Sequence, residues 1–308
     1  MVYRGDFMVK IVKFNIVDVL YETGEEKMDY GVAMSGANLE WEESMGEGIK
    51  IGIIDSGIDL YHPDLVGRVK KYRNFTSEDK NDVTDGNGHG THVAGIMAAN
   101  KNGRGIVGVA PMASLYIAKA FNKNGMAEDS VVSESLKWLI QNNVNIINMS
   151  FSSNSVPSYY NEIKKAYDKG IIIVCAAGNN GRAKGRGLGY PARYEETISV
   201  ASVDMRGKVS DFSSRNVNAD IAAAGFEILS CYPGGRYAKF SGTSMAAPII
   251  SGAAAILQKK AKNRLGRFLS PEEMRTVLCM HCEDIEKKGP DNSSGCGVFS
   301  FGRLGRKK

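Results

Sequence analysis

The stretch IGIIDSG, residues 51–57, decides the fold of this chain. Its apolar half is typical of a buried strand, and Asp55 and the glycine that follow are typical of a turn. Similar short apolar runs recur, separated by helix-like stretches. This alternation predicts a mostly parallel sheet covered by helices on both faces, an α/β fold. The expected strands are 51–54, 114–118, 144–149, 171–175 and 197–201, and two expected helices are 129–142 and 159–169.

Length and composition indicate one ordinary globular domain. The chain has 308 residues, which allows one large domain or two small ones, and no repeat or linker divides residues 26–300. An apolar content of 43% and a charged content of 24% exclude a disordered, collagenous or coiled-coil protein. The net charge of +5 comes in part from a basic tail at residues 303–308, so we expect no nucleic-acid partner.

The sequence also predicts a compartment. No segment approaches the 18 or more apolar residues of a membrane span, and polar residues interrupt the stretch 9–20, so we expect neither a membrane anchor nor a signal peptide. Five cysteines without a secretion signal predict reduced thiols in the cytoplasm. The spacing of Cys279, His281, Cys282 and Cys296 leaves a zinc site as the alternative, although one ligand pair alone is visible.

Chemically useful side chains follow the predicted strands. Asp55 ends the first run, His89 and His92 lie in GHGTHVAG (88–95), and Asn179 follows the run 171–175. Ser244 lies in FSGTSMAAP (240–248), before a predicted helix. Taken alone, Asp55 and Ser244 read as caps, and the histidines as packed residues or a metal pair. Together they supply a nucleophile, a base, a carboxylate that orients the base, and an oxyanion donor.

The helix after Ser244 carries a proline. We expect the helix to be entered through the glycine turn, with Pro248 tolerated because it falls in the first turn.

Four blocks of the sequence resemble the subtilisin family of serine proteases: 55–57, 88–95, 176–179 and 242–248. The similarity runs from about residue 30 to about residue 304. It implies a single-domain, three-layer subtilisin-like fold over residues 26–302 and hydrolysis of peptide or protein substrates through an acyl-enzyme. By this resemblance Asp55 orients the imidazole of His89, His89 is the general base, Ser244 is the nucleophile and Asn179 donates to the oxyanion. His92 matches a second, non-catalytic histidine of the family.

The resemblance also implies a substrate pocket. The family commonly has two glycines where this chain has Ser152 and Ser153, and a leucine where it has Phe151, which leaves a narrow-specificity processing protease as an alternative to a general one. A non-catalytic scaffold is a second alternative, opposed by the four catalytic positions, which all hold the required residue types. The pocket residues implied by the resemblance are Ser150, Phe151, Ser152, Ala177, Gly178 and Gly189.

A calcium site is implied in the same way. Its ligands would be oxygen atoms alone, which suits calcium rather than zinc. An acidic loop at residues 78–85 is expected to be a solvated face. The implied calcium ligands are the side chains of Glu26, Asp64 and Asn102 and the backbone carbonyls of Asn100, Arg104 and Ile106.

The first 25 residues resemble the short extension of the bacterial intracellular subtilisins. In that branch the extension crosses the active site and is clipped on activation, so the chain is expected to be a zymogen in which residues 14–20 lie as a strand over the cleft. The extension lacks the Leu-Ile-Pro-Tyr motif associated with this inhibition, which leaves a loosely packed arm as the alternative. The sequence leaves open whether the protein is a homodimer.

Overall fold

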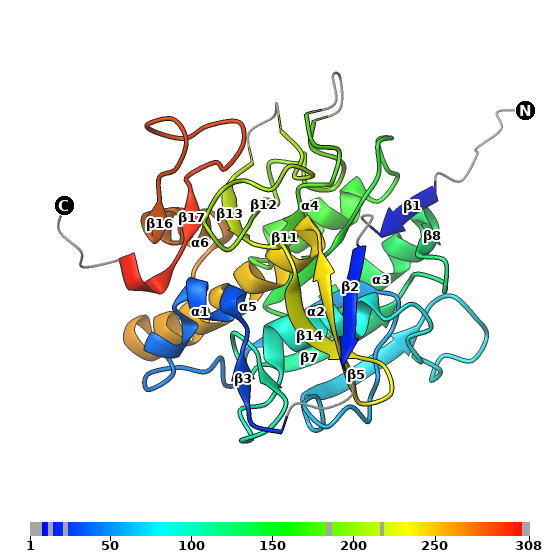
Figure 1. Ribbon diagram of the computed structural model, residues 1–308. Coiled ribbons are helices and arrows are strands. Elements are labelled where there is room, and N and C mark those ends of the chain that lie inside the picture. The colour runs from blue at the N-terminus through cyan, green and yellow to red at the C-terminus, as the bar shows by residue number, and fades with distance from the viewer. Residues whose placement is uncertain (1–7, 12–14, 21–23, 183–186, 216–218, 304–308) are drawn as a thin grey trace, which may run out of the picture.

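A computed structural model describes residues 8–11, 15–20, 24–182, 187–215 and 219–303 (Figure 1). Its centre is a nine-stranded sheet in which every neighbouring pair is parallel except β16–β17. From one edge to the other, the strands are β5 (Val69–Asn74), β7 (Ser114–Lys119), β4 (Lys50–Asp55), β9 (Ile146–Met149), β11 (Ile172–Ala176), β12 (Ile198–Val203), β13 (Ile221–Ala224), β17 (Val298–Phe299) and β16 (Cys282–Glu283).

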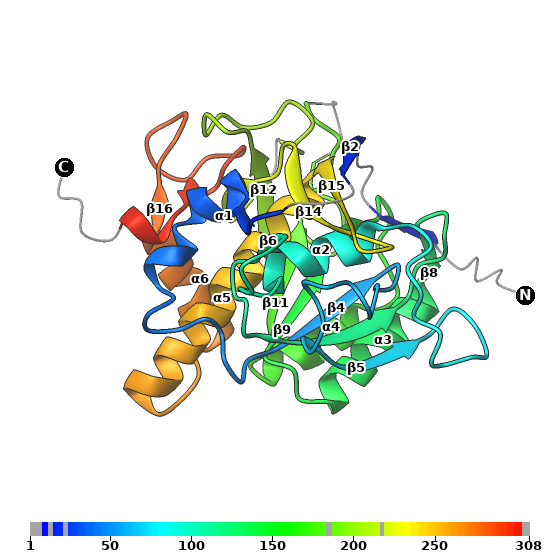
Figure 2. The ribbon, with the colours of Figure 1, turned by 60° about the horizontal axis from the view of Figure 1, so that its bottom comes forward.

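Helices cover both faces of this sheet, as expected from the sequence (Figure 2). The alternation of side chains along β4 divides its residues between two cores. Ile51 and Ile53 lie in the core with α2 and α5, whereas Ile54 lies in the core with α3 and α4. Gly52 permits close packing there, because a Cβ atom would lie 2.7 Å from the Leu139 side chain. The helices are α1 (Tyr30–Ser35), α2 (His89–Ala98), α3 (Asp129–Gln141), α4 (Tyr160–Asp168), α5 (Thr243–Leu265) and α6 (Pro271–Met280).

Three small sheets surround the central one. Two of them include the segments β1 and β2 of the N-terminal extension. The sheets are β1 (Met8–Ile11) between β8 (Met126–Glu128) and β10 (Phe151–Ser152), β15 (Arg236–Ser241) between β2 (Asn15–Leu20) and β14 (Ile228–Tyr232), and β3 (Lys27–Met28) beside β6 (Ile106–Val107). Short 3₁₀ turns lie at η1 (Ala37–Leu39) and η2 (Phe301–Arg303).

The expectation of reduced thiols is wrong for two cysteines. Cys279 at the end of α6 and Cys296 form a disulfide with Cα atoms 5.4 Å apart, while Cys175, Cys231 and Cys282 are free. The two cysteines are separated by 17 positions in sequence, and their approach depends on how the chain returns to α6 before β17. The zinc alternative fails as well, because two of its thiols are bonded to each other.

Two other expectations concern the ends of the chain and the membrane. Within the described ranges no helix is long and apolar enough to cross a membrane. The basic tail predicted at 303–308 falls, from residue 304 onward, outside the described residues.

Candidate active site

The four predicted catalytic residues come from four different elements that meet at one edge of the central sheet. Asp55 ends β4, His89 begins α2, Ser244 lies in the first turn of α5, and Asn179 follows β11. In an open parallel sheet the carboxyl ends of the strands share one edge, where ligands bind. Residues separated by up to 189 positions in sequence are therefore brought to one place.

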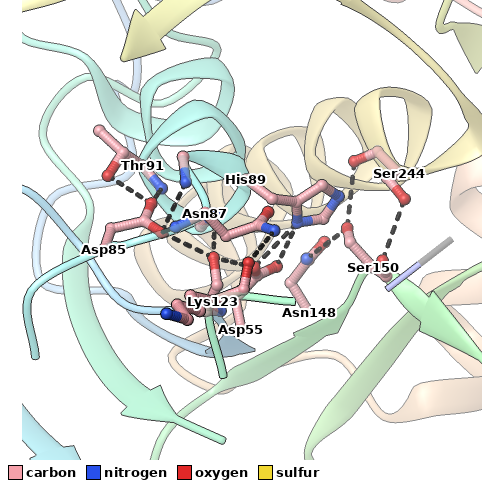
Figure 3. Close-up of polar contacts among 12 residues, drawn as sticks. Asp55, Asp85, Asn87, His89, Thr91, Lys123, Asn148, Ser150 and Ser244 are labelled. Atoms are coloured by element: carbon pink, nitrogen blue, oxygen red, sulfur yellow. Dashed lines mark hydrogen bonds and ion pairs between the residues drawn. The ribbon is translucent and has the colours of Figure 1, made fainter. Parts of the chain in front are cut away.

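Asp55 and His89 form a buried pair. The Nδ1 atom of His89 lies 2.8 Å from Oδ1 and 3.0 Å from Oδ2 of Asp55, and both side chains are fully buried. The Ser56 N–H also donates to Asp55, at 2.7 Å. A hydrogen bond from Nδ1–H to a buried carboxylate fixes the imidazole tautomer that presents Nε2 as a base. Figure 3 shows the ring extending from Asp55 toward the turn that carries Ser244.

Asp85 supports this pair and was misjudged from the sequence. We expected a solvated acidic loop, but the Asp85 side chain is 5% exposed, while neighbouring acids of the loop are exposed. Its carboxylate accepts hydrogen bonds from the hydroxyls of Ser56 and Thr91 at 2.8 and 2.7 Å, and from three backbone N–H groups at the start of α2 (Figure 3). It therefore caps the helix that carries the histidine and ties that helix to the turn after Asp55.

Ser244 is held by a reciprocal pair of hydrogen bonds with Ser150 (Figure 3). The Ser244 hydroxyl donates to the Ser150 carbonyl at 3.0 Å, and the Ser150 hydroxyl donates to the Ser244 carbonyl at 3.1 Å. The Asn148 amide in turn donates to the Ser150 hydroxyl at 2.9 Å. The first turn of α5 is thus fastened to the end of β9.

The position of Pro248 explains why Ser150 is needed. The helix begins at Thr243, so Pro248 is its sixth residue and lies beyond the first turn, contrary to our expectation. Proline has no N–H, and in an α-helix the missing bond would go to the carbonyl four residues earlier, which is that of Ser244. The Ser150 hydroxyl supplies the hydrogen bond that Pro248 cannot.

Asn179 is oriented by the residue that precedes the nucleophile. Its amide oxygen accepts hydrogen bonds from the Thr243 N–H at 3.0 Å and from the Thr243 hydroxyl at 2.8 Å. With the oxygen fixed in this way, the NH₂ group of Asn179 is directed away from Thr243. This orientation suits a donor to a negatively charged oxygen that forms near Ser244.

His92 is a structural residue, as the resemblance implies. Its Nε2 atom lies 3.0 Å from the carbonyl oxygens of Ile228 and Ala238, and its ring stacks on Phe240. Complete burial lowers the pKa of His92 to about 3, so the ring stays neutral at physiological pH.

The predicted pocket residues lie on adjacent segments. Phe151 and Ser152 form β10, and Phe151 is buried against Phe121 with ring centroids 4.9 Å apart. The loop that contains Gly189 is fastened to the end of this wall, because Ser153 and Tyr190 exchange two backbone hydrogen bonds of 2.8 Å. Residues 150–152 follow β9, Ala177 and Gly178 follow β11, and Gly189 lies beside Ser152.

Strand β1 of the extension lies between β10, which carries the predicted pocket residues Phe151 and Ser152, and β8. It pairs antiparallel with β10 on one side and with β8 on the other. Lys10 is opposite Ser152, and the Ile11 N–H donates to the Gly125 carbonyl at 2.9 Å. Val9 is fully buried, whereas Met8 is 42% exposed.

Strand β2 of the extension lies beside β15 (Figure 2). It pairs antiparallel with β15, and Asn15 is opposite Ser241, three positions before Ser244. Residues 15–20 form a strand, as predicted, and Phe14 falls outside the described residues. That this strand lies over the cleft stays a prediction.

The predicted calcium ligands gather around one loop. The fully buried Asp64 accepts hydrogen bonds from the Ile106 N–H at 2.9 Å, from the Asn102 amide at 3.1 Å and from the Tyr237 hydroxyl at 2.9 Å. The Asn100 N–H donates to the Asp64 backbone carbonyl at 2.7 Å.

Glu26 reaches the same loop from the other side. One of its carboxylate oxygens accepts hydrogen bonds from the Asn102 and Gly103 N–H groups at 2.7 and 2.9 Å, and the Asn102 amide oxygen accepts from the Arg104 N–H at 3.1 Å. The donor set fits calcium in kind, because two carboxylates and an amide oxygen face one short loop. A bound ion would replace some of the hydrogen bonds these oxygens now accept.

The fastening of Ser244 can be tested by a double-mutant cycle. In a Ser244→Ala background, which prevents self-digestion, Ser150→Ala should lower the free energy of unfolding by about 1–3 kcal/mol, because the buried carbonyl of residue 244 loses its donor. With Pro248→Ala the helix supplies an N–H of its own, so the cost of Ser150→Ala should fall by about 1 kcal/mol. Urea unfolding of the four proteins measures both costs, and equal costs in the two backgrounds would contradict this explanation.

Comparison with known proteins agrees with this geometry. A profile described as the Subtilase family matches residues 46–297. The chain is 40% identical to "Intracellular serine protease" of Paenibacillus polymyxa over 276 residues, which is 88% of this chain and 84% of that protein. It is 40% identical to "Major intracellular serine protease" of Bacillus subtilis (strain 168), over 84% and 85% of the two chains, and 39% identical to Subtilisin E of the same organism, over 76% and 62%.

Proposed function

The chain belongs to the subtilase family and is a subtilisin-like serine endopeptidase, and from that premise we propose that it cleaves peptide bonds through an acyl-enzyme formed on Ser244. The observation that carries the proposal is the fully buried Asp55–His89 pair beside the turn that bears Ser244. A pair of this kind supplies the base that a serine hydroxyl needs to become a nucleophile.

In the first half of the reaction, the Ser244 oxygen attacks the carbonyl carbon of the substrate, and its proton passes to Nε2 of His89. Asp55 holds the other ring nitrogen and stabilises the charged imidazole. The negative oxygen of the tetrahedral intermediate accepts hydrogen bonds from the Asn179 amide and the Ser244 N–H. The C–N bond then breaks, and the departing amine takes the proton from His89.

In the second half, water attacks the ester and gives its proton to His89. The acid product leaves and the Ser244 hydroxyl is restored. In the resting arrangement that hydroxyl donates to the Ser150 carbonyl, so transfer of its proton to His89 requires a rotation about the Cα–Cβ bond of Ser244.

Substitutions at two residues test this assignment. Ser244→Ala should abolish hydrolysis of a chromogenic tetrapeptide anilide. Asn179→Leu should lower kcat by about 10²–10³-fold, the loss known for the corresponding donor in subtilisin, with little change in KM. Ser155→Ala, at an exposed serine, is the control and should leave kcat unchanged. Full activity of Ser244→Ala would refute the acyl-enzyme.

We further propose that the extension restrains the enzyme. An extended substrate binds by adding a strand between edges of the protein, with main-chain hydrogen bonds as the main source of affinity. Strand β1 already pairs with β10, which carries the predicted pocket residues Phe151 and Ser152, and with β8 on its other side. Substrate and extension would therefore compete for the same backbone groups. The loosely packed arm is disfavoured by the complete burial of Val9.

The restraint predicts a gain of activity when β1 is detached. Deletion of residues 1–25, or Val9→Asp, should raise kcat/KM for a peptide anilide several-fold, because a buried charge opposes docking of the strand. Met8→Asp places the same charge at an exposed position of the same strand and should change little. Equal rates for all four proteins, or lower rates after deletion, would contradict the proposal.

Calcium is the proposed structural cofactor. The side chains of Glu26, Asp64 and Asn102 would hold it, together with the carbonyls of Asn100, Arg104 and Ile106. When bound, the ion would bridge the start of the domain to the loop after α2 and neutralise two carboxylates. It takes no part in the reaction itself, which the residues around Ser244 perform.

Thermal unfolding of the Ser244→Ala protein tests the calcium site. Calcium at about 100 times its Kd stabilises a folded protein by about 2.7 kcal/mol, which for a domain of this size corresponds to a rise in Tm of roughly 4 °C over the chelated protein. Glu26→Ala should reduce this rise. Glu25→Ala, at the exposed neighbour, should preserve it. A Tm independent of both calcium and chelator would exclude the site.

A cytoplasmic location is also proposed. It is supported by the names of the two intracellular relatives. Because disulfides are rare in reducing compartments, this location requires the Cys279–Cys296 bond to withstand cellular thiols. A homodimer stays a prediction.

A further inference from the structure

In the predicted pocket beside Ser244, Ser152 stands where the family commonly has a glycine. Strand alternation directs the side chains of Phe151 and Ser152 to opposite faces of β10. Phe151 is buried and packs on Phe121. Ser152 therefore projects on the other side, toward the loop that contains Gly189.

Two glycines face the Ser152 side chain. A Cβ atom on Gly189 would lie 2.8 Å from Cβ and 3.1 Å from Oγ of Ser152, and a Cβ atom on Gly178 would lie 3.8 Å from the same Oγ. By resemblance to the family, Gly178 would belong to the opposite wall of the pocket and Gly189 to its floor. The hydroxymethyl group of Ser152 thus occupies space between wall and floor that the two glycines leave open.

The backbone around this space offers little freedom to widen it. The floor loop is tied to the end of β10 by the two 2.8 Å hydrogen bonds between Ser153 and Tyr190. Gly178 has a φ of 104°, a conformation that side chains rarely adopt, and its N–H donates to the Thr243 hydroxyl at 3.1 Å. Movement of this wall would disturb Thr243, which orients Asn179.

We propose that Ser152 is a specificity-determining residue that restricts the residue before the scissile bond to small side chains, alanine above phenylalanine. The inference rests on the proposed protease function. A hydrophobic pocket discriminates by about 10–200-fold for each methylene that it admits or refuses. An aromatic ring would have to displace a side chain that is held on a strand, whereas a methyl group fits beside it. The substrate class is therefore peptides and proteins with alanine-sized residues at the cleaved position.

The test compares two peptide anilides that differ in the last residue alone, alanine or phenylalanine, on the protein of 308 residues. The ratio of their kcat/KM values is independent of the fraction of enzyme that the extension restrains. We expect a ratio in favour of alanine for the parent protein. Ser152→Gly should shift it toward phenylalanine by at least 10-fold, and Ser152→Ala, which removes the hydroxyl alone, by less. Ser155→Gly repeats the serine-to-glycine change at an exposed position nearby and should leave the ratio unchanged.

The outcomes separate this inference from the proposed function. A parent protein that prefers phenylalanine, or a ratio that Ser152→Gly moves less than two-fold, would overturn the role of Ser152 while hydrolysis itself persists. Absence of hydrolysis of both peptides by every variant, including the 1–25 deletion, would overturn the protease function and the inference with it. If Ser152→Gly fails to fold, Ser152→Ala decides instead. A kcat/KM ratio shifted toward phenylalanine supports the role of Ser152, and an unchanged ratio overturns it.

Discussion

The arrangement around the active site depends on one constraint, the burial of the Asp55 carboxylate at the end of β4. A charged group removed from water is costly unless it is paired and hydrogen-bonded. The Ser56 N–H and the His89 ring meet that need, and the surrounding chain is shaped so that they can. A Cβ atom on Gly90 would lie 2.2 Å from the Gly57 carbonyl oxygen, so the start of α2 approaches the turn after Asp55 this closely only because residue 90 is a glycine.

The sequence predicted five of the nine central strands, β7, β4, β9, β11 and β12, because these are largely buried apolar runs. The run 171–175, for example, became Ile172–Ala176. The sequence did not predict β5, whose residues are mostly exposed, or the short strands β13, β17 and β16. The catalytic residues were also identifiable, since each follows a strand or begins a helix at the same edge. Asp85 was misjudged because its neighbours in the loop are charged and exposed, and local composition does not reveal which acid turns inward to cap α2. The Cys279–Cys296 pairing depends on the path of the chain between α6 and β17, which no local pattern encodes.

The error over Pro248 shows how a tertiary contact can override a local rule. A proline in the second turn of a helix removes a hydrogen bond, and this usually marks the end or the start of the helix. In α5 the carbonyl that loses its partner belongs to Ser244, and the Ser150 hydroxyl from a different strand replaces the missing donor. The replacement places the turn that bears the nucleophile under the control of β9. One hydrogen bond, from the Ser150 hydroxyl to the Ser244 carbonyl, therefore both compensates for the proline and positions Ser244.

The docking of the extension and the binding of substrate both depend on the backbone edges of β8 and β10. Segments β8 and β10 present backbone groups that are suited to an added strand, and unpaired edges of this kind attract any extended chain. In this protein β1 occupies them, with Val9 fully buried and Lys10 opposite Ser152. The pairing is made by backbone atoms and is therefore tolerant of sequence, which explains how an extension without the Leu-Ile-Pro-Tyr motif can still dock. Discrimination among substrates must then come from side-chain pockets, and Ser152 is the residue that lies both on the paired strand and between the pocket's glycines.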